Sequence, residues 1–355
     1  MIIVGVSGGV DSSVSALLLK KQYAEVKGVF MHNWEDDGSG ECRAEQDRLD
    51  ALRVCAKLDI PFVGRNFAKQ YKEQVFAQFL DGYARGITPN PDILCNREVK
   101  FKVFLEDAIS QGADKIATGH YVQKGDLHGR SVLLRGRDHT KDQSYFLHAI
   151  THDALMRSEF PIGHLEKTKV RALAEEAGLI TANKKDSTGI CFIGEQDFTT
   201  FLSQYLPATK GQIVDETGRV IGEHGGALYF TTGQRARIGG VKGADASLPW
   251  FILEKDVANN VLIAGQGRNH PKLIHSHLEV EDFSWIDGSA PHRVFEGEVQ
   301  IRHLGEAIAA RIECQDDGRV VMTMASPHWA AAIGQSAVVY QGDVCLGGGE
   351  IAVAR

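Results

Sequence analysis

The chain has 355 residues, of which 43% are hydrophobic, and a formal net charge of −7 at neutral pH. This length predicts two or three domains with ordinary cores, and the negative charge excludes a nucleic-acid-binding field spread over the whole surface. Residues 1–195 hold 26 Lys and Arg against 27 Asp and Glu, and residues 196–355 hold 13 against 19. An RNA-binding surface should therefore be a local patch, most readily on the first part of the chain.

The first elements along the chain are a short strand, a glycine turn and the start of a helix. Residues 1–6 form an apolar run rich in β-branched side chains, residues 7–13 supply glycines and hydroxyls, and residues 14–19 are mostly apolar. Backbone N–H groups and the helix dipole at such a turn favour an anion. Gly8 and Gly9 let the backbone approach that anion closely. This order of elements predicts a phosphate-binding loop.

The turn differs from the two commonest nucleotide-binding glycine motifs. A Walker A loop carries a lysine next to its last glycine, and residues 5–13 contain no lysine. The string also departs from the dinucleotide fingerprint G-x-G-x-x-G. The sequence SGGVDS instead resembles the pyrophosphate loop of ATP pyrophosphatases, which implies cleavage of ATP to AMP and pyrophosphate. A glycine-rich turn without a ligand is the alternative.

Apolar strand-like runs alternate with helical stretches up to about residue 195. The expected strands are residues 26–30, 61–63 and 115–118, and the expected helices are residues 46–57, 69–85 and 99–111. This alternation predicts an α/β fold with a doubly wound parallel sheet, which binds ligands at the carboxyl ends of its strands. The strand end at residues 119–120 is therefore a candidate site.

Beyond about residue 205 the helical patterns stop. We expect one small β domain followed by one small barrel or sandwich, because short strands separated by turns are typical of all-β structure. The expected strands are residues 211–215, 228–231, 261–264, 296–301, 307–313, 319–324, 337–340 and 350–353.

Targeting segments and cysteine usage indicate the compartment. No signal peptide precedes the first strand and no apolar run is long enough to cross a bilayer, so we expect a cytoplasmic protein without membrane association. Its thiols should be reduced at rest. No two cysteines form a C-x-x-C pair, so we expect no protein-bound metal cluster. The cysteines are Cys42, Cys55, Cys95, Cys191, Cys314 and Cys345.

Two of these cysteines lie in loops rich in Pro, Gly, Asp and Asn. Residues 88–96 read TPNPDILCN, and neither proline can sit in a helix interior. Cys95 follows this loop just before a helix expected from about residue 99, a position that favours the thiolate. Residues 184–194 read KKDSTGICFIG, where two lysines favour the thiolate of Cys191. We expect both thiols to be functional and the other four cysteines to be small buried hydrophobic residues.

An ATP-cleaving loop together with two reactive cysteines suggests one chemistry. An amide-like carbonyl oxygen is a poor leaving group, and transfer of AMP to that oxygen makes it a good one. A sulfur nucleophile can then displace AMP and leave a thiocarbonyl. A cysteine persulfide is the natural carrier of the sulfur, and a second cysteine can release it by attacking the sulfur–sulfur bond.

Eight strings along the chain are similar to motifs of the tRNA-specific 2-thiouridylase family (MnmA), in the same order. They are GVSGGVDSS, TPNPDILCN, FKVFLEDA, ATGHYV, LLRGRDHTKDQSYFL, KKDSTGICFIGE, GQSAV and VCLGGG. The resemblance implies an adenine nucleotide alpha hydrolase-like catalytic domain at residues 1–200, a small central β domain at 201–272 and a C-terminal β-barrel at 273–355. It also implies conversion of a tRNA wobble uridine to 2-thiouridine: ATP adenylates the C2 oxygen, a cysteine persulfide delivers sulfur, and AMP and pyrophosphate are released.

The resemblance assigns roles position by position. Cys95 would be the nucleophile that assists sulfur release, Cys191 the persulfide carrier, and Asp92 a general acid/base. Asn90, Pro91 and Asp92 would contact the target base. The residues implied to bind ATP are Gly5, Val6, Ser7, Gly8, Gly9, Val10, Asp11, Ser12, Met31 and Gly119.

The resemblance also implies a tRNA surface and partners. A wobble base lies in a single-stranded loop, so it can be flipped into a pocket at modest cost. Magnesium is expected with ATP, where it offsets charge on the pyrophosphate, and Asp11 could help to hold it. The implied partners are tRNAs of the Lys, Glu and Gln type and a persulfide donor, either a relay protein or a cysteine desulfurase; we expect a monomer. The residues implied to contact tRNA are His120, Lys141, Asp142, Gln143, Arg302, His303 and Gln335.

Two other classes of protein fit parts of the pattern. A ligase or amidotransferase with the same ATP loop would act on a small molecule, but it predicts neither two loop cysteines nor RNA-sized β appendages. A non-catalytic RNA-binding protein predicts a broken phosphate loop, whereas residues 7–12 are intact. A structural or solvent-exposed role is the alternative for the tRNA residues, and a place in the core is the alternative for Met31. Whether Cys95 and Cys191 form a transient disulfide stays open.

Overall fold

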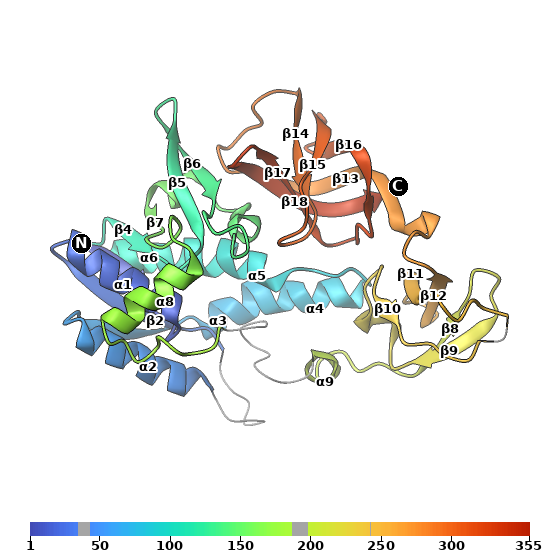
Figure 1. Ribbon diagram of the computed structural model, residues 1–355, viewed down its shortest axis with the longest axis horizontal. Coiled ribbons are helices and arrows are strands. Elements are labelled where there is room, and N and C mark those ends of the chain that lie inside the picture. Colours follow the sequence, from blue (N-terminus) through green and yellow to red (C-terminus); the bar gives the residue numbers. More distant parts are fainter. Residues whose placement is uncertain (35–42, 187–197, 242) are drawn as a thin grey trace.

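Three regions of the chain are built around three sheets (Figure 1). The computed structural model describes residues 1–34, 43–186, 198–241 and 243–355. The N-terminal region holds a parallel sheet between helices, the central region a mixed sheet, and the C-terminal region a closed antiparallel barrel. The expected α/β class, with a doubly wound sheet followed by two β regions, is confirmed.

The parallel sheet gathers its carboxyl ends at one edge. Its strands are β1 (Ile2–Gly5), β2 (Val26–His32), β3 (Phe62–Asn66), β4 (Lys115–Ala117) and β7 (Ser158–Glu159). They are ordered β3-β2-β1-β4-β7, and neighbouring strands run parallel. The strand order reverses between β1 and β4, and open α/β sheets bind ligands at the carboxyl side of such a switch point.

Helices cover both faces of this sheet because the apolar side chains of β1 alternate between the faces. Ile2 and Val4 pack with α1 (Val10–Gln22) and α2 (Arg43–Lys57), whereas Ile3 packs with helices on the other face. The segments on that other face are α3 (Ala68–Tyr71), η1 (Lys72–Phe76), α4 (Ala77–Ala84), α5 (Pro91–Leu94), η2 (Cys95–Val103) and α6 (Phe104–Ser110).

Further helical segments complete this part of the chain. They are η3 (Ser144–Leu147), α7 (His152–Met156), α8 (Lys167–Glu176) and α9 (Phe198–Ser203). Val170 on α8 packs with Val14 and Leu17 on α1, so the two helices lie side by side. In the described parts of the chain, no helix has both the length and the apolar character needed to cross a bilayer.

The helix that carries Cys95 begins at Pro91, so the predicted start near residue 99 is wrong. Asn90 is the N-cap, and its Oδ1 accepts a hydrogen bond from the Asp92 N–H at 3.1 Å. Pro91 takes the first helical position, where a missing N–H is tolerated. The proline-rich loop is therefore shorter than predicted. Cys95–Val103 then has π-helical hydrogen bonding, which is frequent at functional sites.

The central region is a mixed sheet ordered β10-β11-β12-β8-β9. Its strands are β8 (Gly211–Val214), β9 (Val220–His224), β10 (Arg235–Ala236), β11 (Trp250–Asp256) and β12 (Val261–Gln266). The strand expected at residues 228–231 is wrong, because η4 (Ala227–Tyr229) is a 3₁₀ turn in which the Tyr229 N–H bonds back to the Gly226 carbonyl at 3.2 Å. Ala227 is buried in the core, and an apolar run alone does not separate a buried strand from a buried turn.

The C-terminal strands close into a barrel. They are β13 (Ile274–Trp285), β14 (Val294–Gln300), β15 (Ile308–Cys314), β16 (Val320–Trp329), β17 (Ser336–Gln341) and β18 (Val344–Ala354). Each neighbouring pair is antiparallel, and pairing of β13 with β18 closes the ring. Of the two expected forms, barrel or sandwich, the barrel is confirmed.

A hairpin from the N-terminal part of the chain extends this barrel. Its strands β5 (Val122–Leu127) and β6 (Arg130–Arg135) were not predicted. Strand β6 pairs with β18 through Leu134 opposite Val344, and Figure 1 shows the hairpin beside the barrel. The N-terminal and C-terminal regions therefore share one continuous sheet.

Candidate functional site

The glycine turn after β1 has the geometry of an anion site. The Val6 N–H extends the sheet by donating to the Val29 carbonyl at 2.8 Å, and the chain then turns at Gly8, where φ is +78°. A Cβ at Gly8 would collide with the backbone of Asp47, so both conformation and space require glycine. Gly9 is the N-cap of α1, whose first N–H groups lack partners within the helix.

The serines of this turn are engaged in holding its shape. The Ser7 N–H donates to Ser12 Oγ at 3.1 Å, and Ser13 Oγ donates to the Gly9 carbonyl at 2.7 Å. Ser12 and Ser13 are buried. The backbone N–H groups at the start of α1 are therefore the main anion donors of the turn, and the hydroxyls fix their positions.

Three residues expected to bind ATP meet at the carboxyl edge of the sheet. A Cβ at Gly5 would lie 3.1 Å from Met31 Cε, which places the ends of β1 and β2 in contact. A Cβ at Gly119 would lie 2.7 Å from the backbone nitrogen of Ser12, so the residue after β4 packs directly on the start of α1. Gly5, Met31 and Gly119 thus surround the switch point between β1 and β4.

Asp11 is held by two groups that the sequence analysis did not identify. Lys167 Nζ lies 2.8 Å from each carboxylate oxygen of Asp11, and Tyr121 Oη donates to Asp11 Oδ1 at 2.6 Å. Burial, followed by the charge of Asp11, raises the pKa of Tyr121 above its usual range. Tyr121 stands within the string ATGHYV, and Lys167 begins a helix that the sequence analysis did not predict.

Asp186 joins the same cluster from the other side. Its Oδ1 lies 2.7 Å from Lys167 Nζ and accepts from Arg171 Nη2 at 2.7 Å. Burial alone would raise the pKa of Asp186, but hydrogen bonds from Lys167 and Lys141 outweigh it and lower the pKa to about 2. Asp186 precedes residues 187–197, so Cys191 lies outside the described residues.

The loop before the Cys95 helix is held by contacts with two other regions of the chain, the barrel and the central region. The Thr88 N–H donates to the Ile333 carbonyl at 3.2 Å, and the Thr88 carbonyl accepts from Gln335 Nε2 at 2.5 Å. The Thr88 hydroxyl lies 3.2 Å from that of Thr231 in the central region. Gln335, expected to contact tRNA, therefore also braces the loop that leads to Asn90.

Asp92 and His120 are both affected by the charge of Lys100, on the helix that also carries the buried Cys95. Cys95 is 1% exposed and lies in the core of the N-terminal region. Burial raises the pKa of Asp92, and the charge of Lys100 opposes that rise. Burial also lowers the pKa of His120 well below its usual value, with Lys100 adding to the effect. Lys100, which the sequence analysis missed, therefore acts on both Asp92 and His120, whose Nδ1 bonds Thr118 Oγ1 at 2.7 Å.

Lys141 and Gln143 link the expected tRNA surface to the nucleotide edge. Lys141 Nζ donates to Asp186 Oδ2 at 2.9 Å, while its side chain stays 40% exposed. Gln143 Oε1 accepts from the Tyr121 N–H at 2.9 Å. Both side chains thus approach the cluster around Asp11 that Tyr121 also joins.

Asp142, between them in the sequence, is 5% exposed. It accepts from Arg135 Nη1 at 3.1 Å and from Ser144 Oγ at 2.9 Å. Arg135 also donates to Gln300 at 2.8 Å and lies 3.5 Å from the ring centre of Tyr340. Asp142 therefore stabilises the contact between the hairpin and the barrel.

The expected tRNA residues of the barrel lie near the Cys95 helix. The His303 ring lies 4.4 Å from that of Phe146, whose carbonyl accepts from Asn96 Nδ2 at 3.1 Å. The Arg302 guanidinium lies 5.0 Å from the ring centre of Trp329. His303 thus packs on the segment that bonds the Cys95 helix, and together with Arg302 it offers ring and guanidinium groups, which suit RNA bases and phosphates.

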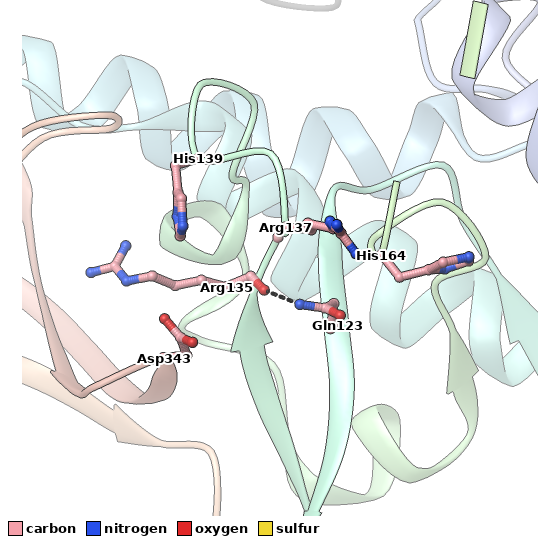
Figure 2. Close-up of a pocket in the computed structure, with 7 residues that line it drawn as sticks. Gln123, Arg135, Arg137, His139, His164 and Asp343 are labelled. Carbon is pink, nitrogen blue, oxygen red and sulfur yellow. Dashed lines mark hydrogen bonds between the residues drawn. The ribbon is translucent and has the colours of Figure 1, made fainter. Parts of the chain in front are cut away.

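A basic pocket of about 350 Å³ lies beside the turn that leads to Lys141. Its lining residues are Gln123, Arg135, Gly136, Arg137, His139, His164 and Asp343. Figure 2 shows Arg135 and Asp343 on one side and Arg137 and His164 on the other; Gln123 Nε2 donates to the Arg135 carbonyl at 2.9 Å. Within the described residues Arg137 has no carboxylate partner, so the pocket favours an anion.

Comparison with known proteins identifies the family. Matching family models are the tRNA methyl transferase HUP domain over residues 1–195, the tRNA methyl transferase PRC-barrel domain over 199–266 and the Aminomethyltransferase beta-barrel domain over 275–351. The tRNA-specific 2-thiouridylase MnmA of Xanthomonas axonopodis pv. citri is 53% identical over 353 residues, covering 99% of this chain and 93% of that protein. Its namesake in Tolumonas auensis is 52% identical over 354 residues, covering 99% and 96%. The chain belongs to the tRNA-specific 2-thiouridylase family.

Membership of the 2-thiouridylase family confirms the resemblance. The cysteines other than Cys95 and Cys191 were expected to be buried structural residues. Cys55 and Cys345 are buried as expected, and burial raises the pKa of each thiol to about 12. Cys314 is only half-buried, so the expectation of a buried residue is wrong there, although its partial burial still raises its pKa. Cys42, like Cys191, lies outside the described residues. Cys55, Cys314 and Cys345 therefore have the environment of structural cysteines.

Proposed function

We propose that this protein converts the wobble uridine of tRNA to 2-thiouridine, using ATP and a sulfur atom carried as a cysteine persulfide. The observation that carries this proposal is that Gly119 and His120 connect the glycine turn to the helix of Cys95. Gly119 packs on Ser12 in the glycine turn, and the ring of His120 lies 5.7 Å from that of Phe101 on the helix of Cys95. ATP activation and thiol chemistry would therefore take place side by side.

In this proposal the uridine C2 oxygen attacks the α-phosphate of ATP, pyrophosphate leaves, and the outer sulfur of a Cys191 persulfide then displaces AMP from C2. The Cys95 thiolate cleaves the sulfur–sulfur bond, so the thiocarbonyl is released and a Cys95–Cys191 disulfide remains for a cellular dithiol to reduce. The raised pKa of Asp92 suits a general acid/base beside the reacting carbonyl. Asn90, Pro91 and Asp92 would contact the base from the helix start.

The nucleotide would lie on the glycine turn, with Gly5, Met31 and Gly119 around it. Magnesium fits the donors present, because it binds proteins through one or two carboxylates together with substrate phosphates, and Asp11 offers one carboxylate at the start of α1. When bound, the ion offsets negative charge on the pyrophosphate as it leaves. The chain's own part is to orient Asp11 through the Tyr121 hydroxyl.

The tRNA would contact the face that joins the three regions. His120, Lys141 and Gln143 lie next to the nucleotide edge, and Arg302, His303 and Gln335 approach from the barrel. The basic pocket of Figure 2 adds positive charge beside them, where an RNA phosphate would bind. Because Asp142 is buried, we propose that it positions its neighbours Lys141 and Gln143 for the RNA.

We further propose the organisation and partners of the working enzyme. Domain limits at residues 1–200, 201–272 and 273–355 follow the three sheets, with the β5–β6 hairpin as the exception that crosses them. The enzyme would act as a cytoplasmic monomer on tRNAs of the Lys, Glu and Gln type. A relay protein or a cysteine desulfurase would load its persulfide.

The deciding experiment is mass spectrometry of nucleosides from unmodified tRNA. The tRNA is incubated with the protein, magnesium-ATP, and a cysteine desulfurase with cysteine as the sulfur source. We expect sulfur at the wobble uridine with the wild type and none with Cys191→Ser. Cys314→Ser, which changes a half-buried thiol of the barrel, is the matched control and should thiolate normally.

Two results would contradict the proposal. If Cys191→Ser thiolates as well as the wild type, the persulfide role is wrong. If the tRNA gains no sulfur but AMP is released with a small substrate, the protein acts as a ligase of the ATP-pyrophosphatase type.

A further inference from the structure

The glycine turn lacks the cation that its ligand would require. Residues 5–13 contain no lysine or arginine, whereas the Walker A loop carries a lysine that reaches the β- and γ-phosphates of its nucleotide. A leaving pyrophosphate gathers negative charge, and fixed cations stabilise such charge in a water-poor site. A positive group from elsewhere in the chain should therefore lie near the start of α1.

Lys167 occupies that position. It is the first residue of α8, and its Nζ lies 2.8 Å from both oxygens of Asp11 in the first turn of α1. The Lys167 N–H donates to Asp138 Oδ2 at 3.0 Å, which fixes the start of α8. Packing of Val170 against Val14 holds the two helices together. The side chain of Lys167 is 11% exposed, so its ammonium is presented at one defined place.

The surrounding charges allow Lys167 to exchange partners. Asp186 keeps Lys141 Nζ at 2.9 Å and Arg171 Nη2 at 2.7 Å when Lys167 turns away. Asp11 keeps the Tyr121 hydroxyl at 2.6 Å. A carboxylate left without partners would oppose such a movement, and neither carboxylate is left in that state.

We propose that Lys167 binds the β- and γ-phosphates of ATP, in the role that the Walker A lysine has in other nucleotide-binding proteins. Its ammonium exchanges Asp11 for phosphate oxygens, and Asp11 is then free to hold the magnesium that accompanies them. No covalent bond changes in this exchange. The inference rests on the proposed function, in which the glycine turn binds ATP, and it adds a residue from α8 to that site.

The test compares ATP with AMP, which lacks the two outer phosphates. Affinities of the wild type and Lys167→Met are measured by isothermal titration calorimetry, with and without magnesium. We expect Lys167→Met to lose roughly 10- to 100-fold in affinity for ATP, the range for one charge-assisted hydrogen bond, and to bind AMP as the wild type does. Lys167→Arg should keep most of the affinity for ATP. Lys169→Met removes the same charge from an exposed position on α8 and should bind both nucleotides normally.

Thermal unfolding of each variant separates this role from a structural one. Unchanged ATP affinity in Lys167→Met overturns the inference. An equal loss of ATP and AMP affinity with a lower unfolding temperature also overturns it, because Lys167 would then be only a brace between α1 and α8. A wild-type protein that binds neither nucleotide would instead contradict the proposed function.

Discussion

Two regions of the molecule hold their residues in different ways. One is the nucleotide edge of the parallel sheet, and the other is the junction between the hairpin, the barrel and the central region. At the nucleotide edge, the glycine turn is held by hydrogen bonds within its own segment. The Ser7 N–H donates to Ser12 Oγ, and Ser13 Oγ donates to the Gly9 carbonyl. These partners lie within one strand-to-helix turn. Local contacts of this kind form wherever the strand and helix form.

At the junction, the contacts join residues that lie far apart in the chain. Gln335 reaches Thr88 across 247 positions, and Arg135 reaches Gln300 across 165. Such contacts form only when the separate regions have already docked. A substitution at the nucleotide edge should therefore affect ligand binding first, whereas a substitution at the junction should affect the fold first.

The largest effect is expected for Asp142→Ala at the junction. Removing this carboxylate leaves Arg135 without its ionic partner where the arginine side chain is 15% exposed. Loss of one member of a buried ion pair costs about 3–5 kcal/mol. Urea unfolding should therefore show a large loss of stability together with the loss of tRNA thiolation.

The matched control for Asp142→Ala is Asp343→Ala. Asp343 lines the basic pocket together with Arg135, the partner of Asp142, but Asp343 is exposed, so its removal should leave the unfolding midpoint close to that of the wild type. If Asp142→Ala unfolds like the wild type and loses only its affinity for tRNA, then Asp142 contacts the RNA directly. The expectation that a substitution at the junction affects the fold first would then be wrong for Asp142.

The next effect is expected at the nucleotide edge, where Gly8 and Gly9 respond differently. Gly8→Ala forces a side chain into φ +78° against the backbone of Asp47, and such strain costs about 1–3 kcal/mol. Gly9 has ordinary φ and only Ser7 Oγ near its Cβ position, at 3.5 Å. Gly9→Ala should therefore keep wild-type stability but lose ATP affinity, because its methyl group occupies the space of the phosphate.

Thermal unfolding and ATP titration distinguish the two glycine variants. Gly8→Ala should be impaired in both measurements and Gly9→Ala in the second alone. Normal ATP binding by Gly9→Ala would show that the phosphate does not approach the backbone at that residue.

The same contrast explains which features the sequence predicted. The strand, glycine turn and helix at the start of the chain were predicted because their signal is local: apolar periodicity, two glycines and a helix start. The start of the Cys95 helix was placed too late because the two prolines were read as a loop. Pro91 in fact fits the first helical position once Asn90 caps the helix.

Long-range features left no comparable signal. The sequence around Asp142 reads as a charged loop, and no pattern in it shows that Arg135, the partner of Asp142, also reaches Gln300 of the barrel 165 positions away. Lys167 lies 156 positions from Asp11 and is brought to it by the packing of α8 on α1. Neither relation is encoded in spacing, so a sequence without an alignment could not reveal it.

A smaller effect is expected where the Thr88 hydroxyl meets that of Thr231, 3.2 Å away. Thr88→Val and Thr231→Val each remove one hydroxyl and keep the branched shape, so each should cost about 0.5–1.5 kcal/mol of unfolding free energy. The double variant should cost less than the sum, since both single changes break the same bond. Strict additivity in urea unfolding would show that the two regions are not coupled at this contact.

The smallest change in stability is expected for Asp92→Asn, and its sign is opposite to the others. Burial raises the pKa of Asp92, so the folded protein binds this proton more tightly than the unfolded chain. The stabilisation from the protonated carboxyl is complete below the unfolded pKa, about 3.9 for Asp, and is lost as pH rises through the higher folded value. At neutral pH the buried, ionised carboxylate therefore lowers the free energy of unfolding, and the neutral side chain of asparagine does not.

Asp92→Asn should consequently unfold at a higher urea concentration than the wild type at neutral pH, and the difference should shrink as the pH is lowered towards the ordinary aspartate range. The same variant should lose thiolation, because the amide cannot exchange a proton with the base. A gain in stability together with a loss of activity would show that Asp92 contributes to catalysis although it lowers the stability of the fold. A variant less stable than the wild type at neutral pH would instead place Asp92 among the residues that hold the helix start together, next to Asn90.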